Sequence, residues 1–180
     1  MIATSTINTD WPSIRLLESC DLPSIAEHYA FEVEHGVATF DTVNPEPDYW
    51  KQKLIESQNG SYPVWVALDA YKDSKVVGWA GVSRFDAKLA YQRSAEFSFY
   101  VLNDYQGRGV GKSLLYHALK QLELHPTIKT LVSRIAIQQE ASVHLHQTFG
   151  FSHIGTLKHV GFKQGAPQSV ALYQRDVLEA

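Results

Sequence analysis

Hydrophobic and polar residues alternate along several stretches of the chain, most clearly at positions 95–102. Aromatic and β-branched residues dominate that stretch, and the alternation predicts a β-strand. From position 110 to 122 the apolar residues instead recur every three or four positions, which predicts an amphipathic helix. The strand and the helix are separated by a turn with three glycines at alternate positions: Gly107, Gly109 and Gly111.

The same patterns predict the other elements. The first helix is expected to begin after Asp21, whose side chain would cap it, with Pro23 in the first turn and Gly36 at its end. Two further helices are expected at 48–58 and 140–149. The remaining strands are expected at 14–17, 62–70, 75–85, 130–137, 151–162 and 169–175, with Gly161, Gly165 and Pro167 in the turn between the last two.

The order of elements is β-α-α-β-β-β-α-β-α-β-β. This order predicts the fold class α/β, with one mixed sheet and helices on both of its faces. No linker divides the chain, so residues 12–180 are expected to form a single domain after a flexible leader at 1–11. Trp50 and Trp65 are expected in the core.

Composition narrows the possible classes of protein. The 180 residues suffice for one domain, and 44% hydrophobic with 12% aromatic residues is typical of a globular protein. A net charge of −3 gives no electrostatic argument for binding nucleic acid or an anionic membrane. The first ten residues lack a basic flank and an apolar core, so we expect no signal peptide, and no apolar run is as long as a membrane span. The single cysteine, Cys20, is expected to be structural and fits a reducing compartment, so we expect a cytoplasmic protein.

The histidines do not form a metal-binding pattern. His144 and His146 are two positions apart on a predicted helix and therefore point to different sides of it. His28 and His35 also lack the i,i+4 spacing that would bring them together. We expect no metal site.

The glycine-rich turn carries the strongest chemical signal. Its backbone N–H groups can approach a ligand closely, and the N-terminus of the following helix adds partial positive charge, so the turn suits a phosphate. A P-loop would need glycine where Gln106 stands, and the dinucleotide-binding fingerprint needs a different glycine spacing. The spacing Gln106-x-x-Gly109-x-Gly111 instead resembles the [RQ]-x-x-G-x-[GA] signature of the GNAT acyltransferases. A plain turn before a surface helix is the alternative interpretation.

Other parts of the chain share this resemblance. The run from Gln139 through Ser142, Leu145 and His146 to Phe151 resembles the later GNAT motif N-x-x-S-x-x-L-[YH]-x-x-x-G-F. Further matches point to one branch, the phosphinothricin and methionine-sulfoximine N-acetyltransferases. These matches are His28-Tyr29, Thr39-Phe40-Asp41, Ala90-Tyr91, Glu96 and Val160-Gly161-Phe162-Lys163.

The resemblance implies a GNAT-like fold and acetyl-coenzyme A (acetyl-CoA) as co-substrate. The glycine-rich turn would hold the pyrophosphate, and a backbone N–H near Val101 or Leu102 would stabilise the oxyanion of the reaction. The residues that the resemblance implies for cofactor binding are Val101, Leu102, Gln106, Gly107, Arg108, Gly109, Val110, Gly111, Lys112, Gln139 and Ser142.

Two residues are candidates for proton transfer. Glu96, inside the predicted central strand, matches the acidic position of the branch and would take the proton of the attacking amine. The alternative is an exposed strand residue. His146 falls where many relatives have a tyrosine, and would donate a proton to the leaving thiolate. The alternative is a histidine on the helix surface.

The acceptor site is expected around Phe40, Arg84, Lys88 and Tyr91. A cation there would pair with a carboxylate of the substrate and aromatic rings would line its side chain, unless Arg84 and Lys88 are only solvated loop charges. The chain departs from the branch in this region and elsewhere. The branch usually has Glu at the position of Asp41 and Asn at the position of Gln139. It usually has two arginines at Asp86 and Lys88, Trp at Pro167 and Asp at Ser169.

The resemblance therefore implies a cytoplasmic N-acetyltransferase. Its acceptor would be the primary amine of a small molecule, an amino acid or an analogue such as phosphinothricin or methionine sulfoximine, attacked without a covalent enzyme intermediate. The alternatives are a GNAT acting on a peptide N-terminus, a polyamine or an antibiotic amine, and a non-catalytic acyl-CoA-binding domain. Relatives imply a homodimer, and no nucleic-acid or membrane partner is expected.

Overall fold

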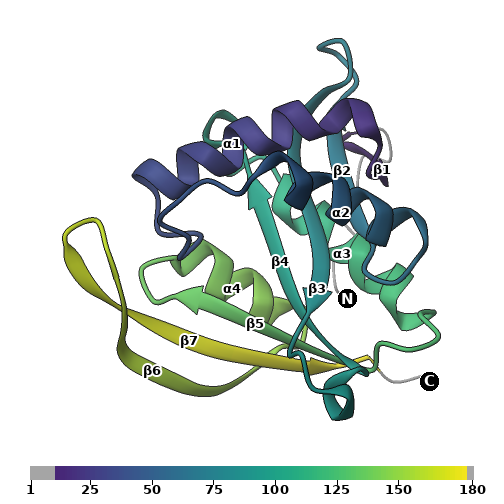
Figure 1. Ribbon diagram of the computed structural model, residues 1–180. Helices are drawn as coiled ribbons and strands as arrows, with labels where there is room; N and C mark the ends of the chain where they lie inside the picture. Colours follow the sequence, from purple (N-terminus) through teal and green to yellow (C-terminus); the bar gives the residue numbers. More distant parts are fainter. Residues whose placement is uncertain (1–10, 178–180) are drawn as a thin grey trace, which may run out of the picture.

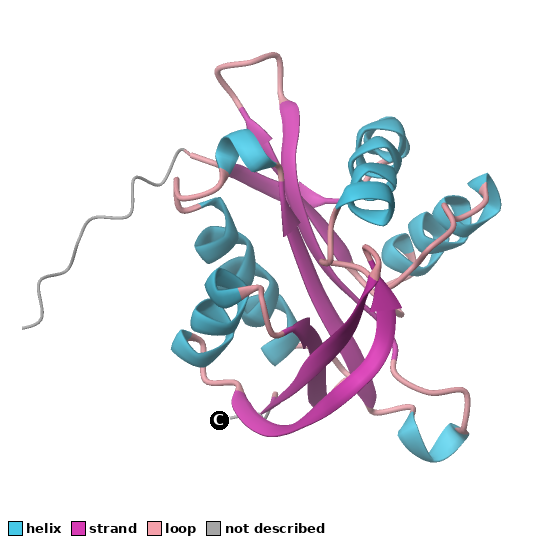
Figure 2. Cartoon of the chain, turned by 90° about the vertical axis from the view of Figure 1, so that its left-hand side faces the viewer, coloured by secondary structure: helices cyan, strands magenta, loops and turns pink. Residues whose placement is uncertain are grey.

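The computed structural model describes residues 11–177, which form one sheet between two layers of helices (Figures 1 and 2). The seven strands lie in the order β1-β2-β3-β4-β5-β7-β6, and only the pairing of β4 with β5 is parallel. This arrangement confirms the predicted α/β class. The strands are β1 (Ser13–Leu16), β2 (Val64–Asp69), β3 (Lys75–Arg84), β4 (Ser94–Val101), β5 (Thr130–Ala136), β6 (Ser152–Lys163) and β7 (Ala166–Asp176).

The helices divide the apolar residues between the two faces of the sheet. Helices α1 (Leu22–His35) and α2 (Pro47–Gln58) cover a cluster that contains Trp50, which confirms its place in the core. Helices α3 (Val110–Glu123) and α4 (Glu140–Thr148) cover the larger cluster, which contains Trp65, also as expected.

Alternation along β4 decides which side chains reach each layer. Ala95 and Phe97 are fully buried in the cluster under α3. Tyr100 packs instead against the cluster under α1 and α2, and the period of two places Glu96 and Ser98 on that same face. Strand β4 therefore presents its polar residues to the α1 and α2 layer.

Strands β4 and β5 pair only at their first residues. The parallel ladder joins Ser94–Glu96 to Thr130–Val132 and then stops, although both strands continue beyond it. Beyond this point a hydrogen bond from a side chain links the two strands in place of a backbone bond. The Ser133 hydroxyl donates to the Phe97 carbonyl oxygen at 2.9 Å. The strands therefore separate toward their C-terminal ends, and backbone groups of β4 face the gap.

The final hairpin differs from the expectation. The turn consists only of Gln164 and Gly165, both at positive φ (54° and 72°), and the hairpin is long (Figure 1). Gly161 and Pro167 lie within the strands, because the ladder pairs Gly161 with Gln168 and continues through Pro167. Glycine is needed at 161 for packing, since a Cβ there would lie 2.6 Å from the ring of Phe40.

One local expectation in the N-terminal part is wrong. The Asp21 carboxylate does not cap α1; it accepts hydrogen bonds from Arg15 at 2.6 and 2.9 Å and from the Glu18 N–H at 2.9 Å. Cys20 is exposed and not part of the core. Trp11 packs against the core cluster, while the rest of the predicted leader lies outside the described residues. No helix within residues 11–177 is long and apolar enough to cross a membrane.

The close approach of β3 to β4 gives a stability prediction. A Cβ on Gly78 would lie 2.7 Å from the Tyr100 carbonyl oxygen, so Gly78→Ala forces backbone movement. We expect a loss of roughly 1 to 3 kcal/mol of unfolding free energy, measured by urea denaturation. The matched control is Gly155→Ala in β6, where a Cβ meets nothing within 4 Å. Equal effects of the two substitutions would contradict the packing described here.

Candidate active site

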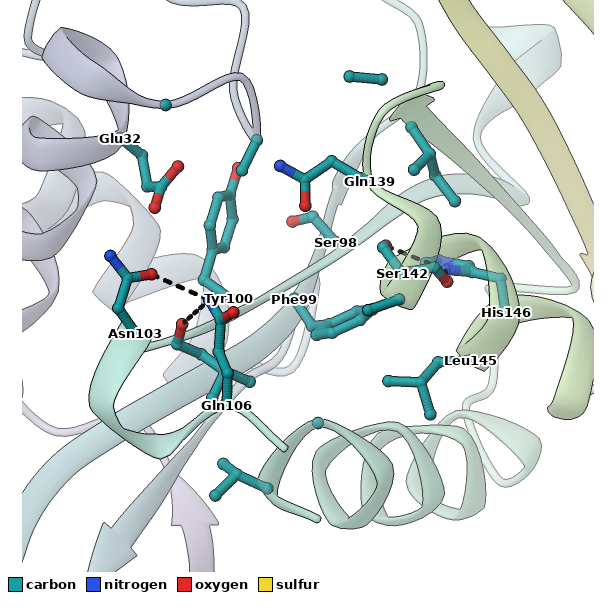
Figure 3. A pocket seen from close by; sticks show the side chains of 18 of the residues that line it. Glu32, Ser98, Phe99, Tyr100, Asn103, Gln106, Gln139, Ser142, Leu145 and His146 are labelled. Atoms are coloured by element: carbon teal, nitrogen blue, oxygen red, sulfur yellow. Dashed lines mark hydrogen bonds between the residues drawn. The ribbon is translucent and has the colours of Figure 1, made fainter. Parts of the chain in front are cut away.

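A cavity of about 760 Å³ lies where β4 and β5 separate. Its floor is β4 from residue 97 to 101, and its walls come from the glycine-rich turn, from β5 and α4, and from α1 with the following loop. The close view in Figure 3 shows Glu32 of α1 and Gln139 projecting into it from opposite walls, with Tyr100 between them. The cavity therefore joins residues from four separate parts of the sequence.

The glycine-rich turn leads from β4 into α3 in the geometry that a phosphate site needs. Gly107 and Gly109 have φ of 71° and 87°, a left-handed conformation that costs other residues energy. Gly109 is the residue before the first turn of α3, so the unpaired N–H groups of the helix point toward the turn. The Gln106 side-chain amide ties the turn to the segment that leads into it from β4. It donates to Asn103 Oδ1 at 3.0 Å and to the Val101 carbonyl oxygen at 3.3 Å.

The structure brings the predicted cofactor-binding residues to one cavity, with exceptions. Gly107, Gly109, Val110, Gly111 and Lys112 line it, as do Val101, Gln106, Gln139 and Ser142. Arg108 does not line it; its guanidinium lies 5.4 Å from the ring centre of Tyr105, beside a separate small pocket.

The expectation for the Leu102 N–H is wrong. That group donates to the Val77 carbonyl oxygen at 3.0 Å and so belongs to the sheet. Because successive backbone groups alternate in direction, the N–H groups of Phe99 and Val101 point the other way, toward the gap beside β5. The two cleft-facing amides of β4 are thus the geometrically suitable donors for a ligand lying along the strand.

His146 occupies the interface between α4 and β5. It is 2% exposed, so the alternative interpretation of His146 as a surface histidine is wrong. Its Nδ1–H donates to the Ser142 carbonyl oxygen at 2.8 Å, and its Nε2 lies 3.0 Å from the Ser133 hydroxyl. Burial lowers the pKa of the imidazole from 6.5 to about 4. At neutral pH the ring is neutral with its one proton held by α4, so the geometry does not favour proton donation to a thiolate.

Glu96 stands at the last paired position of the parallel ladder, with its side chain 26% exposed. Its Oε2 accepts a hydrogen bond from Arg134 Nη1 at 2.8 Å. Burial raises the pKa of the carboxyl, while the charges of Arg134 and Lys53 oppose that shift. A carboxyl whose pKa is raised by burial, on the polar face of β4, has the properties of a general base.

Comparison with known proteins identifies the family. The model of the GNAT acetyltransferase domain matches residues 14–168. The chain belongs to the GNAT acetyltransferase family. It is 36% identical to a phosphinothricin N-acetyltransferase of Streptomyces coelicolor, over 86% of this chain and 90% of the relative. It is 28% identical to an L-methionine sulfoximine/L-methionine sulfone acetyltransferase of Salmonella typhimurium, over 85% and 87% of the two chains.

A solved structure agrees with these relatives. The crystal structure of a GNAT superfamily phosphinothricin acetyltransferase from Sinorhizobium meliloti in complex with acetyl-CoA has a TM-score of 0.85 and 30% identity. The match covers 94% of this chain and 90% of that chain. The predicted family, GNAT fold and enzyme class, an N-acetyltransferase that uses acetyl-CoA, are therefore confirmed.

The four residues expected to bind the acceptor substrate of this GNAT acetyltransferase do not line the cavity. Arg84 donates to the carbonyl oxygens of Asp86 and Ala87 at 2.8 and 2.5 Å, so its guanidinium stabilises the loop that follows β3. Lys88 and Tyr91 are exposed, and Tyr91 packs edge-to-face on Phe85 at 5.6 Å. Phe40 lies over Gly161 of β6.

The α1 wall of the cavity in this GNAT acetyltransferase was not predicted from the sequence. His28 and Glu32 line the cavity, one helical turn apart, with Nε2 and Oε1 separated by 3.9 Å. Neither ring nitrogen of His28 has a hydrogen-bond partner within the described residues, and burial lowers its pKa. Their i,i+4 spacing was the available signal. Among residues 11–177 no group of three His, Cys, Asp or Glu side chains could hold a metal ion.

The buried imidazole gives a prediction for stability against pH. The pKa of His146 is lower in the folded protein than in the unfolded chain, so stability is present above pH 6.5 and is lost as the pH falls toward about 4. The loss amounts to roughly 3 kcal/mol. Urea denaturation at several pH values should show a flatter slope in His146→Phe. The exposed His153 is the control, since His153→Phe should keep the slope; equal slopes in all three proteins would contradict the assignment.

Proposed function

We propose that the protein transfers the acetyl group of acetyl-CoA to the primary amine of a small molecule, an amino acid or an analogue such as phosphinothricin or methionine sulfoximine. The observation that carries the proposal is the cavity between the separated strands. It joins the phosphate-binding turn to Ser98 and Tyr100 on the polar face of β4 and to Arg134 of β5. Glu96 does not line the cavity itself, but it lies on that same face of β4 and is paired with Arg134. The printed names of the similar proteins support this choice of acceptor.

The residues of this chain suit the parts of the cofactor. Backbone N–H groups of the turn at 107–111 would hold the pyrophosphate at the start of α3. The outward amides of Phe99 and Val101 would bind the pantetheine arm and the oxyanion, and a preorganised donor of this kind is worth roughly 3 kcal/mol. The bound co-substrate supplies a thioester as the acyl donor.

Glu96 is the proposed general base. An amine with a pKa of roughly 8 to 10 is mostly protonated at neutral pH, so one proton must leave before attack. In the proposed step the nitrogen forms a bond to the thioester carbonyl carbon, the carbon–sulfur bond breaks, and its electron pair leaves on sulfur. The first ammonium proton goes to Glu96 before attack, directly or through water. The nitrogen loses a second proton to solvent as the tetrahedral intermediate collapses, and the departing thiolate takes up a proton from solvent. No covalent enzyme intermediate is needed.

The acceptor, the cytoplasmic location and the homodimer remain predictions. A GNAT acting on a peptide N-terminus, a polyamine or an antibiotic amine would use the same cofactor site, and a screen of amines with CoA release as readout distinguishes them. A non-catalytic acyl-CoA-binding domain would bind acetyl-CoA without releasing thiol for any amine.

Removing the base tests the chemical step. Glu96→Gln should lower kcat at neutral pH by roughly 100-fold or more, because the ammonium loses its proton acceptor. The deficit should shrink as the pH rises and free amine becomes abundant in solution. Thiol release is the measurement, and calorimetry should show unchanged acetyl-CoA binding. Glu123→Gln on α3, another carboxylate paired with an arginine, is the control; a similar loss there would contradict the assignment.

The glycine-rich turn gives a prediction for cofactor affinity. Gly109→Ala places a side chain on a residue with φ of 87° and should weaken acetyl-CoA binding roughly tenfold, because the left-handed backbone then costs about 1 to 2 kcal/mol. Gly165→Ala in the β6–β7 turn, at φ of 72°, carries similar strain far from the cavity in sequence and does not line it. Calorimetry should find normal affinity in that control. Normal affinity in both variants would contradict the proposed phosphate site.

A further inference from the structure

Arg134 and Glu96 form an ion pair at the point where the two central strands cease to pair. Glu96 and Val132 are the last residues of the parallel ladder, and Arg134 follows two residues later on the same face of β5. The separation of 2.8 Å between Nη1 and Oε2 is that of a charge-assisted hydrogen bond. The pair therefore spans the opening of the gap between β4 and β5.

The Arg134 guanidinium has N–H donors that are not used by Glu96. Among the interactions of residues 11–177, its Nη1 makes the one hydrogen bond of the guanidinium, so Nη2 and Nε stay available. The side chain is 48% exposed and lines the cavity, and its guanidinium lies 5.9 Å from the ring centre of Phe85. A guanidinium can bind two acceptors along different edges, and its second edge fits a carboxylate with two parallel hydrogen bonds.

The same pairing restrains the proposed base. Burial raises the pKa of Glu96, but the neighbouring charge of Arg134 lowers it, and the hydrogen bond occupies one carboxylate oxygen. An isolated amine would find a base already paired with a cation. An α-amino acid brings its own carboxylate on the carbon next to the ammonium, so it can engage both partners at once.

The other charged groups near this pair leave room for an anion. Lys53 of α2 also acts electrostatically on Glu96, which makes two cations around one carboxylate. Glu56 accompanies Lys53 on the same helix and offsets part of that charge, whereas the ion pair that Arg134 forms within residues 11–177 is the one with Glu96. Arg84 and Lys88, the cations expected from the sequence, are directed to their loop or to solvent.

We propose that Arg134 and Glu96 together form the receptor for a zwitterionic α-amino acid, with the acceptor carboxylate on the free edge of Arg134 and its ammonium on Glu96. The inference rests on the proposed function and names the determinant of its substrate class. As the carboxylate of the acceptor engages Arg134, the ion pair loosens and Glu96 becomes free to accept the ammonium proton. Arg134 thus determines specificity, and amines without an α-carboxylate are poor acceptors.

A pair of acceptors that differ only in the carboxylate tests this role. L-methionine sulfone and 3-(methylsulfonyl)propan-1-amine share the side chain and the amine, and thiol release gives kcat/KM for each. The wild type should prefer the amino acid, and Arg134→Ala should lower kcat/KM for the amino acid roughly 30- to 100-fold while leaving the simple amine unchanged or faster. Arg134→Lys should recover only part of the preference, because an ammonium cannot form the bidentate contact.

Arg175→Ala is the matched control. Arg175 forms an ion pair with Glu123 of α3 at 3.1 Å, so the variant also removes one exposed Arg–Glu pair. It should leave the ratio of the two kcat/KM values unchanged. In Arg134→Ala, but not in the control, the acid limb of the pH profile for the simple amine should move to higher pH, because Glu96 loses its neighbouring cation.

Two results would overturn the inference while N-acetyl transfer stands. The first is a wild type that acetylates both compounds equally well, and the second is an Arg134→Ala variant that slows both by the same factor. Calorimetry of L-methionine sulfone with the protein–CoA complex gives a readout that needs no turnover, and it separates failure of this inference from failure of the proposed function. Binding by the wild type that survives in Arg134→Ala would contradict the role of the arginine even if no turnover occurred.

Discussion

β4 and β5 share a ladder of only Ser94–Glu96 with Thr130–Val132, and the position where that ladder ends organises the site. Beyond it, β5 no longer supplies backbone partners to β4, so the amides of Phe99 and Val101 are left facing a cavity. The Ser133 hydroxyl bridges the first step of the gap to the Phe97 carbonyl oxygen. A backbone that would otherwise complete a sheet is therefore kept available for a ligand that lies along it as an additional strand.

His146 helps to hold the strands in this arrangement. Its ring is packed between aromatic side chains, with Phe151 at 4.8 Å and Phe99 at 5.6 Å, and it joins α4 to Ser133 of β5. A neutral imidazole fits this place because its Nδ1–H donates to the Ser142 carbonyl oxygen without the cost of a buried charge. The residue thus contributes through the geometry of the gap, which fixes where the cofactor can lie.

The sequence predicted those parts of the molecule that follow from local spacing. Alternation along β4, the helical period of α3 and the Gln106–Gly111 motif gave the strand, the helix and the turn correctly. Local patterns could not reveal the Ser133–His146 contact or the Arg134–Glu96 pair, because each joins residues from different elements. The direction of the Leu102 N–H depends on its register with β3. Gly161 and Pro167 resembled a turn because both residue types are rare inside strands.

The outer wall of the cavity is assembled from opposite ends of the polypeptide. Lys163 of β6 donates to the carbonyl oxygens of Glu32 and Thr39 at 2.9 and 2.6 Å, and Phe40 lies over Gly161. These contacts join residues more than 120 positions apart, so they must offset the entropic cost of closing a long loop. During synthesis on the ribosome, the strand–turn–helix unit at 94–123 emerges before β6 exists. The segment that would bind the cofactor is consequently made before β6, and the wall that would confine an acceptor is complete only when the last hairpin is in place.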